Sequence, residues 1–267
     1  MYSFCDTNSI PSGSPLPAEA ICYNSKWIDN EIPQFRTLYV SGRESFSADI
    51  TEAALESRDG SVFLRRRLVP RTITVGYQMT AGTASELMSA FNRLNALMSG
   101  TQVQVIFADE PDKYYTGTCK GIGSPEPGRL AVKGEMEIYC PDPCKYSTVM
   151  SEVTAAGAAD ALEIEYGGTY PARPVISASM TVAGTEVTYE LWSAAVQVRK
   201  SSFASGDVVE IDCNAATVRL NGTLTPSIGD IANDFEGMLL QPGTNLIGIT
   251  HTGCSPATTV YYREAWL

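Results

Sequence analysis

Alternation of apolar and polar residues predicts one strand in the N-terminal half with particular clarity. Residues 72–79 read Thr-Ile-Thr-Val-Gly-Tyr-Gln-Met, so every second residue is apolar. Side chains of a strand point to its two faces in turn, and this spacing is therefore typical of a strand with one buried face. Shorter alternating patterns at 103–107 and 136–138 predict two further strands.

A single helix is predicted between these strands. Thr83 and Glu86 have the spacing of a capping box, in which the hydroxyl and the carboxylate accept hydrogen bonds from free amides of the first turn. Gly100 suits the left-handed position just beyond a helix C-terminus. Between them, apolar residues recur at helical spacing and should pack on a sheet; they are Leu87, Phe91, Leu94 and Met98.

The C-terminal half is nearly all strand by its pattern. At least seven short segments alternate, and their apolar positions are Leu162/Ile164/Tyr166, Ile176/Ala178/Met180/Val182, Val187/Tyr189/Leu191, Val196/Val198, Val209/Ile211/Cys213, Val218/Leu220 and Ile247/Ile249. Asn221-Gly222 lies between two such segments and predicts a tight hairpin. Many short strands with frequent turns favour an antiparallel β-sandwich.

The length and the proline positions predict two domains. A chain of 267 residues exceeds one typical domain, and Pro141-Asp142-Pro143 interrupts the strand pattern. We therefore predict a mainly β protein with an N-terminal domain at 1–146, which is β-rich with one α-helix, and a C-terminal β-sandwich at 147–267. Residues 10–17 cannot hold a regular element and should form an extended arm or loop. Our hypothesis is that this segment contacts a neighbouring copy, and the candidate contact residues are Pro11, Pro15, Leu16 and Pro17.

Charge and cysteine content narrow the possible partners. The net charge is −11, with 14 basic and 17 acidic residues in 1–150 but 5 and 13 in 151–267. Such a surface repels a phosphate backbone, so nonspecific nucleic-acid binding is not expected, although DNA could pass through a ring of these chains. The sequence predicts no signal peptide and no membrane span. Seven scattered cysteines favour reduced thiols in a protein that folds in a cytosol.

Candidate catalytic and metal-binding residues are few. His251 is the only histidine, and a structural role is the expected one. Cys140 and Cys144 lack the second pair of ligands that structural zinc needs. The carboxylates of 109–112 favour a solvated turn over a glycosidase or calcium site. No phosphate-binding glycine loop or dinucleotide motif is present in the sequence. We therefore predict no catalytic residues, no metal and no cofactor.

Two groups of residues are candidates for binding other molecules. Arg65, Arg66 and Arg67, with Arg71 nearby, form the one basic run. They are either solvated strand residues or an intersubunit contact to acidic groups of another copy, and both interpretations stay open. Trp192 is a weak candidate for stacking on a sugar, whereas a core or interface role is the usual one for a tryptophan.

Short segments along nearly the whole chain resemble the distal tail protein family of phages with long, non-contractile tails. Each segment is weak alone, but their order and spacing are specific; they are 16–20, 37–44, 58–60, 70–75, 91–95, 107–111, 114–117, 140–143, 171–174, 206–212, 220–222 and 240–245.

The resemblance implies an N-terminal domain related to tail-tube proteins, followed by a galectin-like sandwich. Family members form hexameric rings that join the tail tube to the tail-tip hub, and often hold receptor-binding or baseplate proteins, while tape measure protein and DNA pass through. The resemblance also implies a location at the virion tail tip, assembly in the host cytoplasm and no catalytic residues. Such a ring would bury open sheet edges. The first alternative is a carbohydrate-binding adhesin of the tail tip, and the second is a cell-wall hydrolase.

Overall fold

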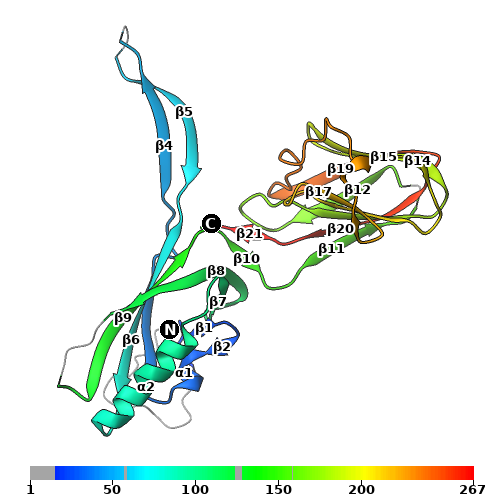
Figure 1. Ribbon diagram of the computed structural model, residues 1–267. Helices are drawn as coiled ribbons and strands as arrows, with labels where there is room; N and C mark the ends of the chain where they lie inside the picture. Colours follow the sequence, from blue (N-terminus) through cyan, green and yellow to red (C-terminus); the bar gives the residue numbers. More distant parts are fainter. Residues whose placement is uncertain (1–15, 57–58, 124–127, 158) are drawn as a thin grey trace. The chain divides into compact units, whose positions relative to one another are not determined.

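The computed structural model describes residues 16–56, 59–123, 128–157 and 159–267. The chain divides into two compact units, of which unit 1 extends to Lys145 and includes Leu267, and unit 2 comprises Tyr146–Trp266. Both units consist mainly of antiparallel strands (Figure 1), which confirms the predicted mainly β fold class. No helix of the described residues is both long and apolar enough to cross a membrane.

Unit 1 is built on one antiparallel sheet with the strand order β2-β1-β7-β8-β9-β6-β3. Its strands are β1 (Ile21–Tyr23), β2 (Lys26–Trp27), β3 (Phe35–Ser41), β6 (Arg71–Thr80), β7 (Val103–Phe107), β8 (Glu110–Ile122) and β9 (Ala131–Cys140). A separate two-stranded sheet consists of β4 (Ala48–Ala54) and β5 (Ser61–Leu68). The alternation at 72–79 reflects a buried face, because Ile73, Val75, Tyr77 and Met79 are all inaccessible to solvent.

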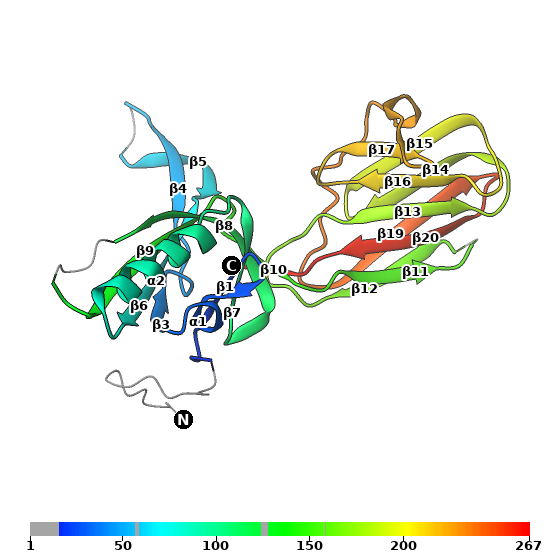
Figure 2. The same cartoon turned by 60° about the horizontal axis from the view of Figure 1, so that its bottom comes forward.

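Helix α2 (Ala84–Leu97) lies across one face of this sheet (Figure 2) and confirms the predicted helix. The Thr83 hydroxyl accepts a hydrogen bond from the Glu86 amide at 3.2 Å, whereas the Glu86 carboxylate reaches the Gly82 amide at 2.9 Å. Leu87, Leu94 and Met98 are buried, and Phe91 is only partly so. A second helix, α1 (Ile28–Glu31), is one turn long, which is too short to give a periodic pattern.

Unit 2 is a sandwich of two antiparallel sheets (Figure 2), with the strand orders β11-β20-β13-β16-β17-β18 and β12-β19-β14-β15. The first sheet contains β11 (Ser151–Ala155), β13 (Val175–Met180), β16 (Val208–Asp212), β17 (Thr217–Leu220), β18 (Thr223–Leu224) and β20 (Pro256–Tyr262). The second contains β12 (Ala161–Tyr166), β14 (Gly184–Leu191), β15 (Ala194–Phe203) and β19 (Gly243–Thr252). A 3-10 turn, η1 (Pro226–Ile228), follows β18, and two short strands, β10 (Lys145–Ser147) and β21 (Ala265–Trp266), pair with each other.

The core of unit 2 matches the alternating positions of the sequence. Residues such as Ile164, Tyr189 and Val196 are fully buried between the two sheets. The predicted hairpin joins β17 to β18, where Asn221 and Gly222 both have positive φ, as such a two-residue turn requires. Val182 differs from the prediction, because it lies beyond the end of β13 and is exposed.

A close backbone approach in unit 2 generates a stability prediction. A Cβ atom at Gly184 would overlap the backbone nitrogen of Cys254, whereas one at Gly248 would lie 3.7 Å from the Glu190 Cβ, an ordinary contact. We expect Gly184→Ala to lower the free energy of unfolding by about 2–4 kcal/mol, because backbone must shift, and Gly248→Ala to change it by less than about 1 kcal/mol. Denaturant titration of both variants tests this; equal effects would contradict the observed packing.

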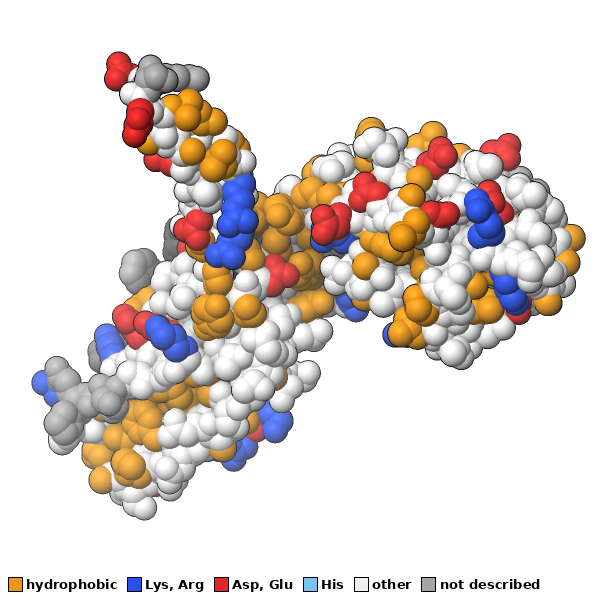
Figure 3. All heavy atoms as spheres, turned by 45° about the horizontal axis from the view of Figure 1, so that its top comes forward, with side chains coloured by type: hydrophobic (Ala, Val, Ile, Leu, Met, Phe, Trp, Pro, Cys, Tyr) orange, Lys and Arg blue, Asp and Glu red, His pale blue; other side chains and the backbone are white. Residues whose placement is uncertain are grey.

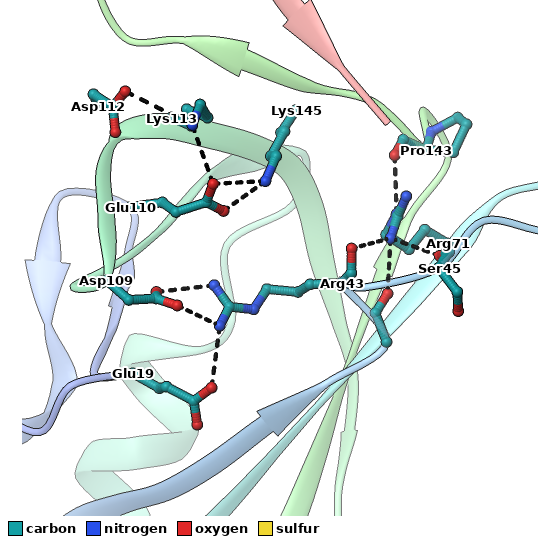
Figure 4. Close-up of polar contacts among 11 residues, drawn as sticks. Glu19, Arg43, Ser45, Arg71, Asp109, Glu110, Asp112, Lys113, Pro143 and Lys145 are labelled. Atoms are coloured by element: carbon teal, nitrogen blue, oxygen red, sulfur yellow. Dashed lines mark hydrogen bonds and ion pairs between the residues drawn. The ribbon is translucent and has the colours of Figure 1, made fainter. Parts of the chain in front are cut away.

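An ion-pair network in unit 1 generates a prediction on pH dependence (Figure 4). The Glu110 carboxylate accepts hydrogen bonds from Lys113 Nζ at 3.1 Å and from Lys145 Nζ at 2.6 and 2.8 Å. Burial raises the pKa of the Glu110 carboxyl. The two ammonium groups, Lys145 and Lys113, together lower this pKa by more than burial raises it, so the pKa lies below its ordinary value. A lowered folded-state pKa gives stability that is present above the unfolded pKa and is lost as the pH falls through the folded one.

Glu110→Gln should therefore lower the free energy of unfolding by about 1 kcal/mol at pH 7, and the loss should shrink as the pH falls below about 4. Denaturant titrations at neutral and acidic pH measure the difference, with the exposed Glu56→Gln as the control. A difference between wild type and Glu110→Gln that stays constant on acidification would show that the ion pairs do not stabilise the fold.

Candidate assembly surface

The β4–β5 hairpin is the most exposed regular element of unit 1. It extends away from the large sheet as a two-stranded ribbon (Figure 1), and its strands pair antiparallel from Ala48↔Leu68 to Ala54↔Ser61. The register shifts between Thr51 and Glu52, where the ladder contains a bulge. A two-stranded hairpin without a third strand or a packed helix is only marginally stable in water.

The two faces of the hairpin differ in chemistry near its root. On the face that we call the polar face, Arg67 Nη2 lies 3.6 Å from an Asp49 carboxylate oxygen, and Arg65 Nε donates to the Thr51 hydroxyl at 3.4 Å. The opposite face carries Ile50 and its register partner Arg66.

Large apolar side chains of this hairpin are open to solvent, and Figure 3 shows apolar and basic side chains along it. Ile50 and Phe63 are each 62% exposed, and the Arg66 guanidinium lies 4.8 Å from the Phe46 ring centroid. We call five exposed residues the hairpin patch: Ile50, Leu55, Phe63 and Leu64 of the hairpin itself, and Phe46 at its root. Burial of one such side chain stabilises an interface by about 1.5–3 kcal/mol, and several large exposed apolar residues on one element are typical of an interaction site.

Two sheet edges, by contrast, are already covered within the protomer. On β3, the Thr37 amide donates to an Asp29 carboxylate oxygen at 2.9 Å, and the Val40 amide donates to Glu19 at 3.0 Å. On β15, the carbonyl groups of Ala195 and Gln197 accept hydrogen bonds from the amides of residues 234 and 230. These backbone groups are not free for strand addition, so the hairpin is the better candidate surface.

The root of the hairpin is fixed by two arginines (Figure 4). Arg43 binds both carboxylate oxygens of Asp109 at 2.9 and 2.8 Å, binds Glu19 at 3.2 Å and stacks on the Phe107 ring at 4.5 Å. Arg71 donates to four backbone carbonyl groups, those of Gly42, Arg43, Ser45 and Pro143, at 2.8–3.0 Å. The carboxylates of 109–112 are thus ion-paired rather than a freely solvated turn.

The structure separates the four arginines that the sequence groups together. Arg65, Arg66 and Arg67 are exposed on β5, and their proposed contact with another copy stays a prediction. Arg71 is only 6% exposed, and its Nε and Nη1 donate to carbonyl groups of its own chain. We therefore correct the interpretation of Arg71 from a surface contact to an internal one. Arg71 lies four residues after Arg67, beyond the end of the hairpin, and is the buried first residue of β6.

The remaining candidate residues belong to other segments of the chain. Pro11 and Pro15 are outside the described residues, whereas Leu16 and Pro17 are half-buried and the Pro17 carbonyl accepts from the Ala20 amide at 3.0 Å. Trp192 is 66% exposed in the turn between β14 and β15, with φ of +56°. Its role in sugar stacking stays a prediction.

The candidate catalytic and metal-binding residues do not come together as a catalytic or metal site among the described residues. His251 lies half-buried in β19 opposite Val187. Burial raises the pKa of Cys140 and of Cys144 to about 12, so both thiols are protonated at neutral pH. No group of three or more potential metal ligands occurs in the part of the chain that the structure describes.

Sequence patterns miss the hairpin for a physical reason. Residues 61–68 read Ser-Val-Phe-Leu-Arg-Arg-Arg-Leu and do not alternate, because neither face of β5 is buried in the protomer. Asp59-Gly60, a turn dipeptide just before β5, is the one local signal that indicates a hairpin here.

Comparisons with known proteins agree with this architecture. Residues 28–140 match the phage tail protein RIFT-related domain, and residues 167–266 match the C-terminal domain of the siphovirus-type tail component. The distal tail protein of Bacillus phage SPP1 is 27% identical over 236 residues, which cover 85% of this chain and 89% of that protein.

A solved structure shows the same fold. The crystal structure of SPP1 Dit, described as a hub adsorption apparatus protein of phages that infect Gram-positive bacteria, superposes with a TM-score of 0.77. The superposition has 21% sequence identity and covers 93% of this chain and 99% of that chain. From these domains and relatives, the chain belongs to the distal tail protein family and is a structural component of a phage tail.

Proposed function

We propose that this chain forms a hexameric ring at the tail tip in which the hairpin patch of each copy is buried against the next copy. The ring joins the tail tube protein to the tail-tip hub, holds receptor-binding or baseplate proteins, and lets tape measure protein and DNA pass through its lumen. Assembly takes place in the host cytoplasm, and no catalytic step is part of this role.

The observation that supports the ring is the exposed hairpin itself. A marginally stable ribbon with five exposed large apolar residues on it and at its root gains free energy when a second chain covers it. A head-to-tail contact between identical copies closes into a ring when the rotation between neighbours is fixed. Arg65 and Arg67 on the polar face add a positive surface to a chain of net charge −11, so an acidic neighbour of the same sequence is electrostatically favourable.

The apolar part of this contact is tested with Ile50→Ser combined with Phe63→Ser. Both side chains are exposed in the protomer, so the pair should leave its stability within about 1 kcal/mol but weaken each contact between copies by about 3 kcal/mol, a loss of roughly a hundredfold in association constant. Mass photometry should give the mass of six 28.8-kDa chains for the wild type and mainly single chains for the variant. Met88→Ser with Leu130→Ser is the matched control, because both residues are exposed in unit 1 outside the hairpin.

The basic part is tested by reversal of all three charges, Arg65→Glu, Arg66→Glu and Arg67→Glu. We expect this triple variant to assemble at least about tenfold more weakly, and the defect to diminish at high salt because screening removes the new repulsion. Lys26→Glu, Arg93→Glu and Lys133→Glu together change the net charge equally at exposed positions and form the control. Unchanged ring mass in both hairpin variants would refute the proposed contact.

A carbohydrate-binding adhesin is the second candidate function, and the exposed Trp192 favours it. An indole in a turn of a rigid sheet can stack on the apolar face of a sugar ring. Calorimetry with cell-wall saccharides tests it: heat of binding that Trp192→Ala abolishes would support the adhesin, and no heat with the wild type would eliminate it.

A further inference from the structure

We infer that Arg71 is a positioning residue for assembly: its single guanidinium fixes the direction in which the β4–β5 hairpin leaves unit 1. The inference rests on the proposed ring, because it assigns to a buried side chain the geometry of the contact between copies. Arg71 is only 6% exposed, so its side chain offers little surface to another chain.

The hairpin is attached to the large sheet by two chain segments that contain no regular secondary structure. The outgoing root is 42–47, between β3 and β4, and the returning root is Val69-Pro70, between β5 and β6. One backbone hydrogen bond, from the Val69 amide to the Ser47 carbonyl at 3.1 Å, joins them. Two short irregular segments of this kind would by themselves act as a hinge.

Arg71 joins these two segments through its side chain. Its backbone directly follows the returning root, and its Nη1 donates to Gly42, Arg43 and Ser45 carbonyl oxygens of the outgoing root at 3.0, 2.8 and 2.9 Å. Its Nε donates to the Pro143 carbonyl at 2.9 Å, so a third segment of unit 1 holds the plane of the guanidinium (Figure 4). A lysine has no counterpart of Nε, so it would lose the bond to Pro143, and its Nζ would end one bond short of the position of Nη1.

The first residues of the outgoing root are held from their other side as well. Gly42 has φ of +89°, and a Cβ atom there would overlap the Thr72 carbonyl oxygen, so the chain crosses closely over β6 at this residue. The Arg43 side chain, bound to Asp109 and Glu19, holds the next residue. Residues 42 and 43 are therefore fixed both by their carbonyl groups and by their own contacts.

The length of the hairpin makes its direction matter. The eight residues of β5 span about 26 Å at about 3.3 Å each. A rotation of about 10° at the root would therefore move the far end by about 4–5 Å, which exceeds the roughly 4 Å separation of apolar atoms in contact. Because a closed ring repeats one rotation at every contact, a loose root would break closure even with the hairpin patch intact.

Arg71→Lys tests this role, with Arg93→Lys on the exposed surface as the matched control. Hydrogen exchange should rise by about tenfold or more in 42–47 while the amides of α2 and of unit 2 stay protected, since only local opening is released. Under conditions in which the wild type forms rings, mass photometry should show the ring population of Arg71→Lys reduced at least about tenfold, with open or mixed oligomers in its place.

A second variant separates direction from folding. Gly-Gly inserted after Ser45 and again after Val69 loosens both roots but leaves every Arg71 acceptor in place, and Gly-Gly inserted after Gly222, in the β17–β18 turn, is its control. Loss of rings in both Arg71→Lys and the root insertion would support the positioning role. If Arg71→Lys does not fold, the ring population of the root insertion alone tests the positioning role. Wild-type ring levels in the root insertion, or in a folded Arg71→Lys whose 42–47 exchange has risen, would overturn it. A wild-type chain that forms no ring even with tube and hub proteins would instead overturn the proposed function.

Discussion

A two-stranded ribbon has no interior in which to bury its side chains, and this constraint determines which apolar residues of unit 1 are exposed to solvent. The long strands of the large sheet contribute buried residues to the core of unit 1, whereas β4 and β5 pair only with each other and contribute none. Five large apolar residues are consequently left in water on one short hairpin and its root. The free energy that these side chains do not gain within the protomer is available to an interface.

Elsewhere in the described part of unit 1, side chains cover backbone groups at one sheet edge and at the root of the hairpin. Asp29 and Glu19 bind amides of β3, a sheet edge that would otherwise be open to another strand. Arg43 and Arg71 bind the root of the hairpin through ion pairs and backbone carbonyl groups. Buried charges add little net stability once their desolvation is counted, and the role that we infer for Arg71 is to set the direction of the hairpin.

The sequence predicts those elements of the fold whose side chains are buried on one face within the protomer. Strand β6 and helix α2 are predictable because a single buried face imposes a period on Ile73, Val75, Leu87 and Leu94. The turn at Asn221-Gly222 is predictable because few residues tolerate positive φ twice in succession. The family resemblance follows from segments spread along the chain, and the matches to tail-protein domains confirm it.

The assembly surface and its root were less accessible to such patterns. A strand with neither face buried in its own protomer has no period to read, and the sequence of β5 accordingly shows none. Proximity in sequence also placed Arg71 with three exposed arginines, although it begins the next strand and points inward. The pairs Arg43–Asp109 and Glu110–Lys145 join residues far apart in the chain, so spacing alone could not indicate them.

Covalent footprinting measures most directly whether the hairpin patch is buried between copies. Purified single chains and assembled tail tips would be labelled with hydroxyl radicals, and the modification of each side chain compared by mass spectrometry. The account predicts that Phe46, Phe63 and Leu64 lose most of their reactivity on assembly while Met88, on the exposed face of α2, retains its own. Equal labelling of the hairpin patch in free and assembled protein would contradict it.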